Sequence, residues 1–161
     1  HAASRDDLFL HLSKYKLRSK VFLEKKDISP FEFAWPTPFS KQMTNKQRIL
    51  KGIPFSPEDV FSQKSFILEC KFDELGAIDW KKGCYLGQEL VAKTKYRGEI
   101  RKKIMPIEFD GILDSDLVVT QDGVDAGDVR SREDGCALAM IRIEFANVPL
   151  FVGSSPIKVL S

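Results

Sequence analysis

Cysteine and histidine are scarce in this sequence. Of its 161 residues, three are cysteine and two are histidine. The cysteines, Cys70, Cys84 and Cys136, are odd in number and form no CxxC pair, which argues against a disulfide framework and fits a reducing compartment. Two histidines are too few for a metal site built from histidine.

Long apolar runs and the common catalytic motifs are also missing. No run approaches the roughly 20 apolar residues that span a bilayer, and no signal-peptide pattern occurs, so we expect no membrane association. There is no GxGxxG, P-loop, HExxH or GxSxG motif, which removes the commonest nucleotide-binding, zinc-protease and serine-hydrolase interpretations. With 43% hydrophobic and 30% charged residues, the composition is typical of a soluble globular protein.

The net charge of +2 conceals a segregation of charge along the chain. Residues 1–80 carry 13 basic and 11 acidic groups, residues 81–103 carry 8 and 2, and residues 104–161 carry 4 and 10. The segment 81–103, here called the basic strip, is suited to attract an acidic protein, the polyglutamate tail of a folate, or nucleic acid. The alternative is that its cations solvate one face and pair with the acidic C-terminal segment.

The basic strip has little aromatic content, only Tyr85 and Tyr96. The stacking platform expected of a single-strand binder is therefore weak, and nucleic acid is the least favoured partner. The candidate partner-binding residues of the strip are its basic side chains, Lys81, Lys82, Lys93, Lys95, Arg97 and Arg101.

Cys84 lies inside the basic strip, where a turn at Lys82-Gly83 is expected to lead into a helix. Leu86, Leu90 and Thr94 recur on one face of that helix, and Gly98 is placed to end it. A thiol just before a helix start lies near the positive end of the helix dipole, and the adjacent lysines add positive charge. These features favour the thiolate, which attacks electrophiles and ligates soft metals. The alternative is a small buried apolar residue.

The segment from Lys82 to Glu89 carries a specific signature, K-G-C-Y-x-G-Q-E. It resembles the signature of the YgfZ-like family, relatives of the glycine-cleavage T-protein. FDELGAIDW at residues 72–80 and RGEIRKKIMPI at residues 97–107 resemble its mitochondrial, Iba-type and Caf-like branch. Within the family that this signature resembles, the cysteine distinguishes the assembly branch from the T-protein transferases, which lack it. Its presence here therefore favours the assembly branch.

That resemblance implies a mitochondrial matrix factor for iron-sulfur cluster assembly, which is not an enzyme and works with A-type, IscA-like scaffold proteins in the maturation of [4Fe-4S] proteins. Cys84 would ligate a [2Fe-2S] cluster shared with the partner, because a cluster needs about four ligands and this chain has no short-range cysteine pairs. We expect a monomer alone and a heterodimer with the partner. No catalytic residue is assigned. The expected cofactor-binding residues are Cys84, Gly83, Tyr85, Gly87, Gln88 and Glu89.

Two other functions remain open. The first is a tetrahydrofolate-dependent aminomethyl or one-carbon transferase, in which folate binding and turnover survive Cys84→Ser. The second is a non-enzymatic folate-sensing or RNA-associated module, whose affinity falls steeply with salt. The chain begins at His1, and the resemblance implies a fragment lacking the first half of the family's fold, where the T-protein's catalytic aspartate lies.

The resemblance and the residue patterns together predict an α+β fold. Residues 1–99 are expected to form part of a T-protein-like folate-binding fold with a ferredoxin-like α/β layer, its N-terminal part missing, and residues 100–161 a small β-barrel. In the first part we expect a helix at 4–19, strands at 21–24 and 30–35, an omitted loop near 36–40, a helix at 46–51 ended by Gly52, a helix start at 56–59 and an extended segment at 66–68. Six strands are expected in the barrel, at 104–109, 117–120, 125–130, 136–145, 150–152 and 157–160, with Cys136 in the core or wall.

Overall fold

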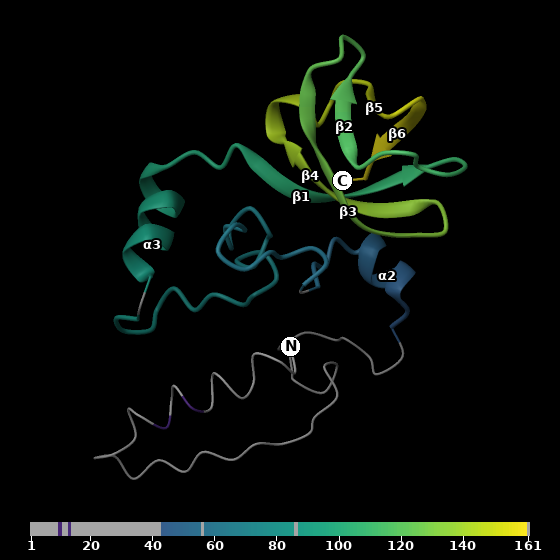
Figure 1. Cartoon of the computed structure of the whole chain (residues 1–161). Coiled ribbons are helices and arrows are strands. Elements are labelled where there is room, and N and C mark those ends of the chain that lie inside the picture. Colours follow the sequence, from purple (N-terminus) through teal and green to yellow (C-terminus); the bar gives the residue numbers. More distant parts are fainter. Residues whose placement is uncertain (1–9, 11–12, 14–42, 56, 86, 161) are drawn as a thin grey trace.

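A closed antiparallel β-barrel forms the C-terminal part of the chain (Figure 1). The computed structural model describes residues 10, 13, 43–55, 57–85 and 87–160. The strands of the barrel are β1 (Lys102–Phe109), β2 (Leu117–Thr120), β3 (Asp125–Glu133), β4 (Cys136–Arg142), β5 (Leu150–Val152) and β6 (Ser155–Val159). Their order around the barrel is β1-β4-β3-β2-β5-β6, and β6 closes it by pairing with β1.

All six predicted strands are confirmed, and the bounds of four of them change. β1 and β6 each begin two residues earlier than predicted and β6 ends one residue earlier, β3 continues to Glu133, and β4 ends at Arg142 where the prediction continued to residue 145. The chain leaves β4 as a short 3-10 turn, η2 (Ile143–Phe145), in which the Ile143 N–H donates to the carbonyl of Arg101 at 2.9 Å. The pairing of β4 ends at Arg142 because its partner β1 begins only at Lys102, which lies opposite Arg142.

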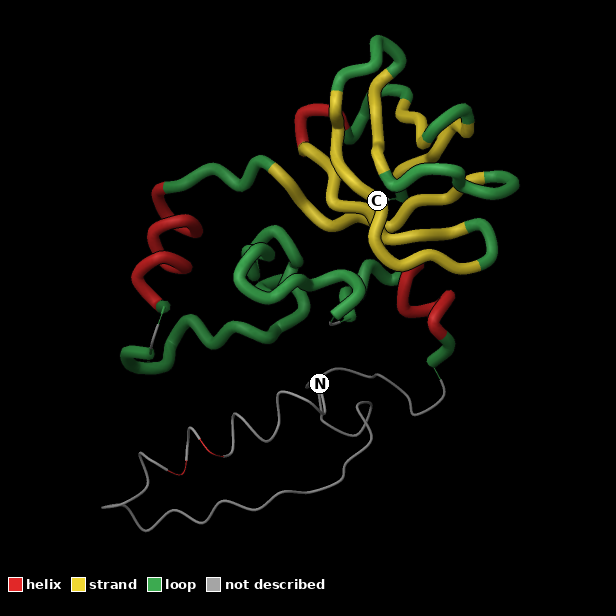
Figure 2. The backbone as a smooth tube through the Cα atoms, in the orientation of Figure 1, coloured by secondary structure: helices red, strands yellow, loops and turns green. Residues whose placement is uncertain are grey.

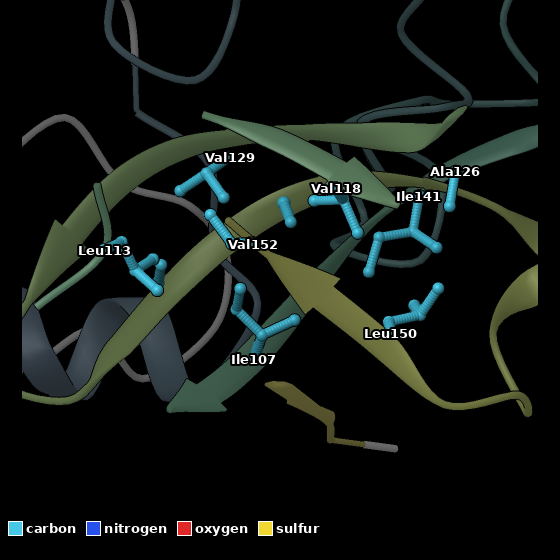
Figure 3. Packing of buried hydrophobic residues seen from close by; sticks show 10 residues of the cluster. Ile107, Leu113, Val118, Ala126, Val129, Ile141, Leu150 and Val152 are labelled. Carbon is cyan, nitrogen blue, oxygen red and sulfur yellow. The ribbon is translucent and has the colours of Figure 1, made fainter. Parts of the chain in front are cut away.

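Aliphatic side chains fill the interior of the barrel (Figure 3). They come from all six strands, whose side chains point alternately into and out of the barrel, and from the connections between the strands. Figure 3 shows Ile107, Val118, Val129, Ile141, Leu150 and Val152 converging on one another.

β4 is buried on both of its faces, because a second apolar cluster covers the outside of the barrel. Ile104 of β1 and Cys136, Leu138 and Met140 of β4 contribute its barrel side. Ile49 and Cys70 pack on them from the preceding segment. Cys136 is thus a wall residue, as predicted, and the segment before the barrel is packed against it by apolar contact.

The helix that packs on the barrel is α2 (Asn45–Leu50), close to the predicted helix at 46–51. A capping box starts it: the Gln47 N–H donates to Thr44 Oγ1 at 3.2 Å, and the Thr44 N–H donates to Gln47 Oε1 at 3.1 Å. It ends at the predicted glycine, where the N–H of Gly52 donates to the carbonyl of Ile49 at 2.8 Å.

A buried ion pair joins α2 to the barrel. Arg48 Nη1 lies 2.6 Å from Asp59 Oδ2, and neither side chain is more than 7% exposed. Arg48 Nη2 donates to the hydroxyl of Ser131 on β3 at 2.9 Å, and the Ser131 N–H donates to Asp59 Oδ1 at 2.9 Å. The Phe55 N–H also donates to the Asp59 carboxylate, at 2.7 Å. Every charge in this network therefore has hydrogen-bonded partners, as buried charges require.

Two predictions for residues 56–68 are wrong. Ser56 lies outside the described residues, but residues 57–60 form a turn and a bend and no helix, because the carboxylate of Asp59 is turned inward to Arg48. Residues 66–68 are not extended but enter consecutive turns, in which the Cys70 N–H donates to the carbonyl of Phe66 at 3.2 Å. These turns place Leu68 and Cys70 in buried positions that an extended chain would not reach.

The second described helix is α3 (Gln88–Arg97), which stands apart from the barrel (Figure 1). A loop-rich segment lies between the two, as the tube in Figure 2 shows. Within residues 43–55, 57–85 and 87–101, α2 and α3 are the regular elements and no strand occurs. No helix in the described part is long and apolar enough to cross a membrane.

The predictions for the first 42 residues fall almost entirely outside the described part. Leu10 and Ser13 are described and are helical. The strands expected at 21–24 and 30–35 and the loop near 36–40 lie outside the described residues. The ferredoxin-like layer, the T-protein-like fold of which it is part and the domain boundary at residue 100 therefore remain predictions.

Candidate functional site

The candidate site is the loop that carries Cys84 immediately before α3. Cys84 is exposed, whereas Cys70 and Cys136 are buried. Burial raises the pKa of the Cys70 thiol, with a further contribution from Glu69. Burial likewise raises the pKa of Cys136, against the opposing charge of Lys46. Among the three thiols, Cys84 is therefore the one that another molecule can reach.

Short hydrogen-bonded turns hold the loop against the start of α3. The Tyr85 N–H donates to Gln88 Oε1 at 3.4 Å, and the Gln88 N–H donates to the Tyr85 carbonyl at 3.1 Å. Gly87, the N-cap, has a φ of 87°, a left-handed conformation that glycine adopts without strain. Lys82 Nζ lies 4.4 Å from the centre of the Tyr85 ring, a cation–π contact. Cys84 thus lies three residues before the N-cap of α3.

The predicted helix is confirmed, but its predicted apolar face is wrong. α3 ends at Gly98, whose N–H donates to the carbonyls of Lys93 and Thr94 at 3.0 and 3.2 Å. Val91 is its buried residue, while Leu90 is 61% exposed. Leu86 lies outside the described residues. The face differs because the attached side of α3 is the one that carries Val91 and Lys95, and Lys95 pairs with Asp73.

Charge and aromatic contacts attach α3 to the segment before the loop. Lys95 Nζ lies 2.7 Å from Asp73 Oδ2 and 5.4 Å from the centre of the Trp80 ring. The rings of Trp80 and Tyr96 meet edge to face, with their centroids 6.1 Å apart. Burial opposes ionisation of Asp73, but the hydrogen bond and charge of Lys95 outweigh it and hold the pKa of Asp73 below its usual value. The same hydrogen bond and charge from Asp73 raise the pKa of Lys95.

The charged residues of the basic strip separate into two groups. Lys95, predicted to bind a partner, is paired with Asp73, and Lys103, from the same strip, pairs with Glu74. These two acids precede the barrel, so the pairing expected with the acidic C-terminal segment does not occur for these two lysines. The second group is exposed and forms no ion pair with a described residue: Lys81, Lys82, Glu89, Lys93, Arg97 and Arg101.

Sequence reasoning missed Asp73 and Trp80, which anchor α3. Both belong to the FDELGAIDW segment, but their pairing with Lys95 joins positions 15 to 22 residues apart, and no local periodicity marks it. In the described part, no three His, Cys, Asp or Glu side chains gather in a group that could hold a metal ion. A hollow of about 560 Å³ lies at the junction of α2, β1 and β6, and no residue of the signature lines it.

Comparison with known proteins agrees with the fold and the signature. Residues 101–161 match the family described as the CAF17 C-terminal beta-barrel domain. Mitochondrial iron-sulfur cluster assembly factor IBA57 is 32% identical in mouse over 118 residues and 31% in human over 117 residues, in each case 69% of this chain and 33% of the relative. The homologue of IBA57 from Coccidioides immitis is 35% identical over 78 residues, which cover 48% of this chain and 18% of the relative.

The matched region of this chain spans about a third of the length of the mammalian relatives. All three relatives are named as mitochondrial, which confirms the mitochondrial localisation expected from the signature. The barrel family and these relatives together show that the chain belongs to the CAF17/IBA57 branch of the YgfZ and glycine-cleavage T-protein superfamily.

Proposed function

We propose that the chain is part of a mitochondrial matrix factor that assembles iron-sulfur clusters together with an A-type, IscA-like scaffold protein. In this proposal Cys84 supplies one thiolate to a [2Fe-2S] cluster shared with the scaffold, on the way to mature [4Fe-4S] proteins. The relatives are named as iron-sulfur cluster assembly factors, which supports the general role in cluster assembly. The observation that carries the assignment of Cys84 is its exposure, in contrast to the two buried cysteines.

The chemistry of the thiols favours a shared cluster. A cluster takes about four ligands, most often cysteine thiolates. Cys70 and Cys136 are buried and their raised pKa values disfavour the thiolate, so neither is available beside Cys84. The remaining ligands therefore come from the partner, and a cluster held partly by each protein is suited to transfer.

The loop around Cys84 supports presentation of the sulfur. Gly87 allows the chain to turn directly into α3, and Gln88 holds the loop through the backbone of Tyr85. Gly83 and Gly87 would shape the loop, and Tyr85, Gln88 and Glu89 would orient it or the partner's groups, as residues around metal ligands commonly do. The exposed cations of the basic strip would orient an acidic partner.

Reconstitution tests this function. The chain is mixed with an A-type scaffold protein, ferrous iron and sulfide under anaerobic, reducing conditions, and cluster formation is followed by visible absorption and circular dichroism. We expect a cluster that depends on both proteins and is lost in Cys84→Ser. The matched controls are Cys70→Ala and Cys136→Ala, which remove the two buried thiols. Both controls are expected to keep the cluster.

Persistence of the shared cluster in Cys84→Ser refutes the assignment. A parallel titration with tetrahydrofolate distinguishes the assembly factor from the alternative, a one-carbon transferase. Folate turnover that survives Cys84→Ser, with no cluster in the wild type, would favour a one-carbon transferase.

A further inference from the structure

The outward face of α3 collects exposed apolar and basic side chains on one side of a helix. At 3.6 residues per turn, five of its residues fall within an arc of roughly 120°. All five are exposed: Glu89, Leu90, Lys93, Tyr96 and Arg97, here called the outer face of α3. Leu90 is 61% and Tyr96 73% exposed, which is high for large apolar side chains.

The opposite side of α3 is attached to the protein, which holds the outer face in place. Val91 is buried, and Lys95 binds Asp73 and lies over Trp80. The rings of Tyr96 and Trp80 meet edge to face, so the Tyr96 ring is positioned although most of it is exposed. A rigid, exposed aromatic side chain binds a partner at a low cost in conformational entropy.

The composition of this face fits a protein partner. Tyrosine and arginine are the residue types enriched where single side chains dominate binding energy, and Leu90 adds apolar area next to them. Lys93 and Arg97 form no ion pair with a described residue, in contrast to Lys95 and Lys103. Glu89 is the acid of the face, and an acid among the cations disfavours a phosphate backbone as the ligand.

On the basis of the proposed function, we propose that the outer face of α3 is the docking surface for the scaffold protein. The partner would present carboxylates to Lys93 and Arg97 around an apolar patch that receives Leu90 and Tyr96. Cys84 lies three residues before the N-cap of this helix, so a partner seated on α3 would approach the loop that carries the sulfur. This assignment excludes Lys95 from the contact, although the sequence alone placed it among the partner-binding residues.

Binding of the chain to the apo A-type scaffold, measured by isothermal titration calorimetry at low salt, tests the surface. We expect the double charge reversal Lys93→Glu/Arg97→Glu to raise Kd by about tenfold or more, and Leu90→Ala/Tyr96→Ala to do the same. The matched control Lys64→Glu/Lys158→Glu makes the same change in net charge at exposed sites outside α3 and is expected to shift Kd less than about twofold. Circular dichroism checks that each variant is folded.

The outcomes separate the surface from the cluster. Cys84→Ser should lose the cluster but keep apo docking, so loss of the cluster with intact docking leaves the surface standing. Wild-type affinity in the α3 variants, or an equal loss in the control, overturns the docking surface but not the role of Cys84. No binding of apo scaffold, self-association of the chain through α3, or a preference of the same face for RNA also overturns it.

Discussion

Removing Asp59 is the sharpest test of how the segment before the barrel is held. Asp59→Ala leaves the Arg48 guanidinium buried without its counter-ion, and the N–H groups of Phe55 and Ser131 lose their acceptor. Breaking one side of a buried ion pair costs about 3–5 kcal/mol. A domain's total stability is about 5–15 kcal/mol, so we expect a large fall in the midpoint of urea unfolding followed by circular dichroism.

Two further variants make this test specific. Glu58→Ala removes the neighbouring, exposed carboxylate and is expected to change the free energy of unfolding by less than about 0.5 kcal/mol. Arg48→Met/Asp59→Leu removes both charges and should be less destabilised than Asp59→Ala, because no unpaired charge remains. Two results would contradict the role given to this pair. One is a loss of less than about 1 kcal/mol in the free energy of unfolding of Asp59→Ala; the other is a loss in the double variant equal to the sum of the losses from its two single substitutions.

Three further predictions concern the thiols, the attachment of α3 and the barrel. In the native chain, Cys84 should react with a maleimide while the two buried thiols react only on unfolding; mass spectrometry counts the adducts, and equal labelling of all three would be inconsistent with their burial. The pKa of Asp73 is lowered, so its pair with Lys95 stabilises the fold above the unfolded-state pKa of about 3.9 and loses this effect as pH falls through the folded-state value. Asp73→Asn should therefore destabilise the chain at pH 7 and much less at pH 3 in urea unfolding; an equal loss at both would rule the pair out. Gly127→Ala should lower the free energy of unfolding by more than about 2 kcal/mol, because the added methyl group would overlap the Met140 carbonyl. In Gly123→Ala the methyl group contacts no other atom, so only the strain of a positive φ remains, and the loss should be about 1 kcal/mol.

The barrel was predictable because its signals are local. Turn residues such as Asp134-Gly135 separate short apolar runs, and each run became a strand of the barrel. The end of β4 was not predictable, since the apolar residues Ile143 and Phe145 continue the pattern while the pairing partner β1 does not continue beside them. Strand length here is decided by the neighbour and not by the residues themselves.

The segment before the barrel was harder to predict because its stabilising contacts are distant in sequence. Asp59 looked like an acid in the first turn of a helix, but Ser131 of β3, 72 residues away, donates to it. Phe66 to Leu68 looked extended because a run of three apolar residues carries no periodicity. Instead, the Cys70 N–H donates back to the Phe66 carbonyl, and Cys70 packs against β1 and β4.

At the candidate site, the sequence indicated the position of Cys84 and the extent of α3, but not which side of the helix faces out. Leu90 and Thr94 seemed to form the apolar face, yet Val91 is the buried residue. The difference arises because Lys95 pairs with Asp73 and lies over Trp80, so the side of the helix that carries Val91 and Lys95 is the attached one. A pattern read along one helix contains no information about such a partner.

The pairing of β6 with β1 has a consequence for how this chain can associate. With the ring of described strands complete, no row of unpaired backbone amides and carbonyls is left at the margin of the sheet. Another protein therefore cannot extend the barrel sheet by adding its own strand, and two copies of the barrel cannot join edge to edge. Any recognition at the barrel must be read out by side chains and by the loops that connect its strands.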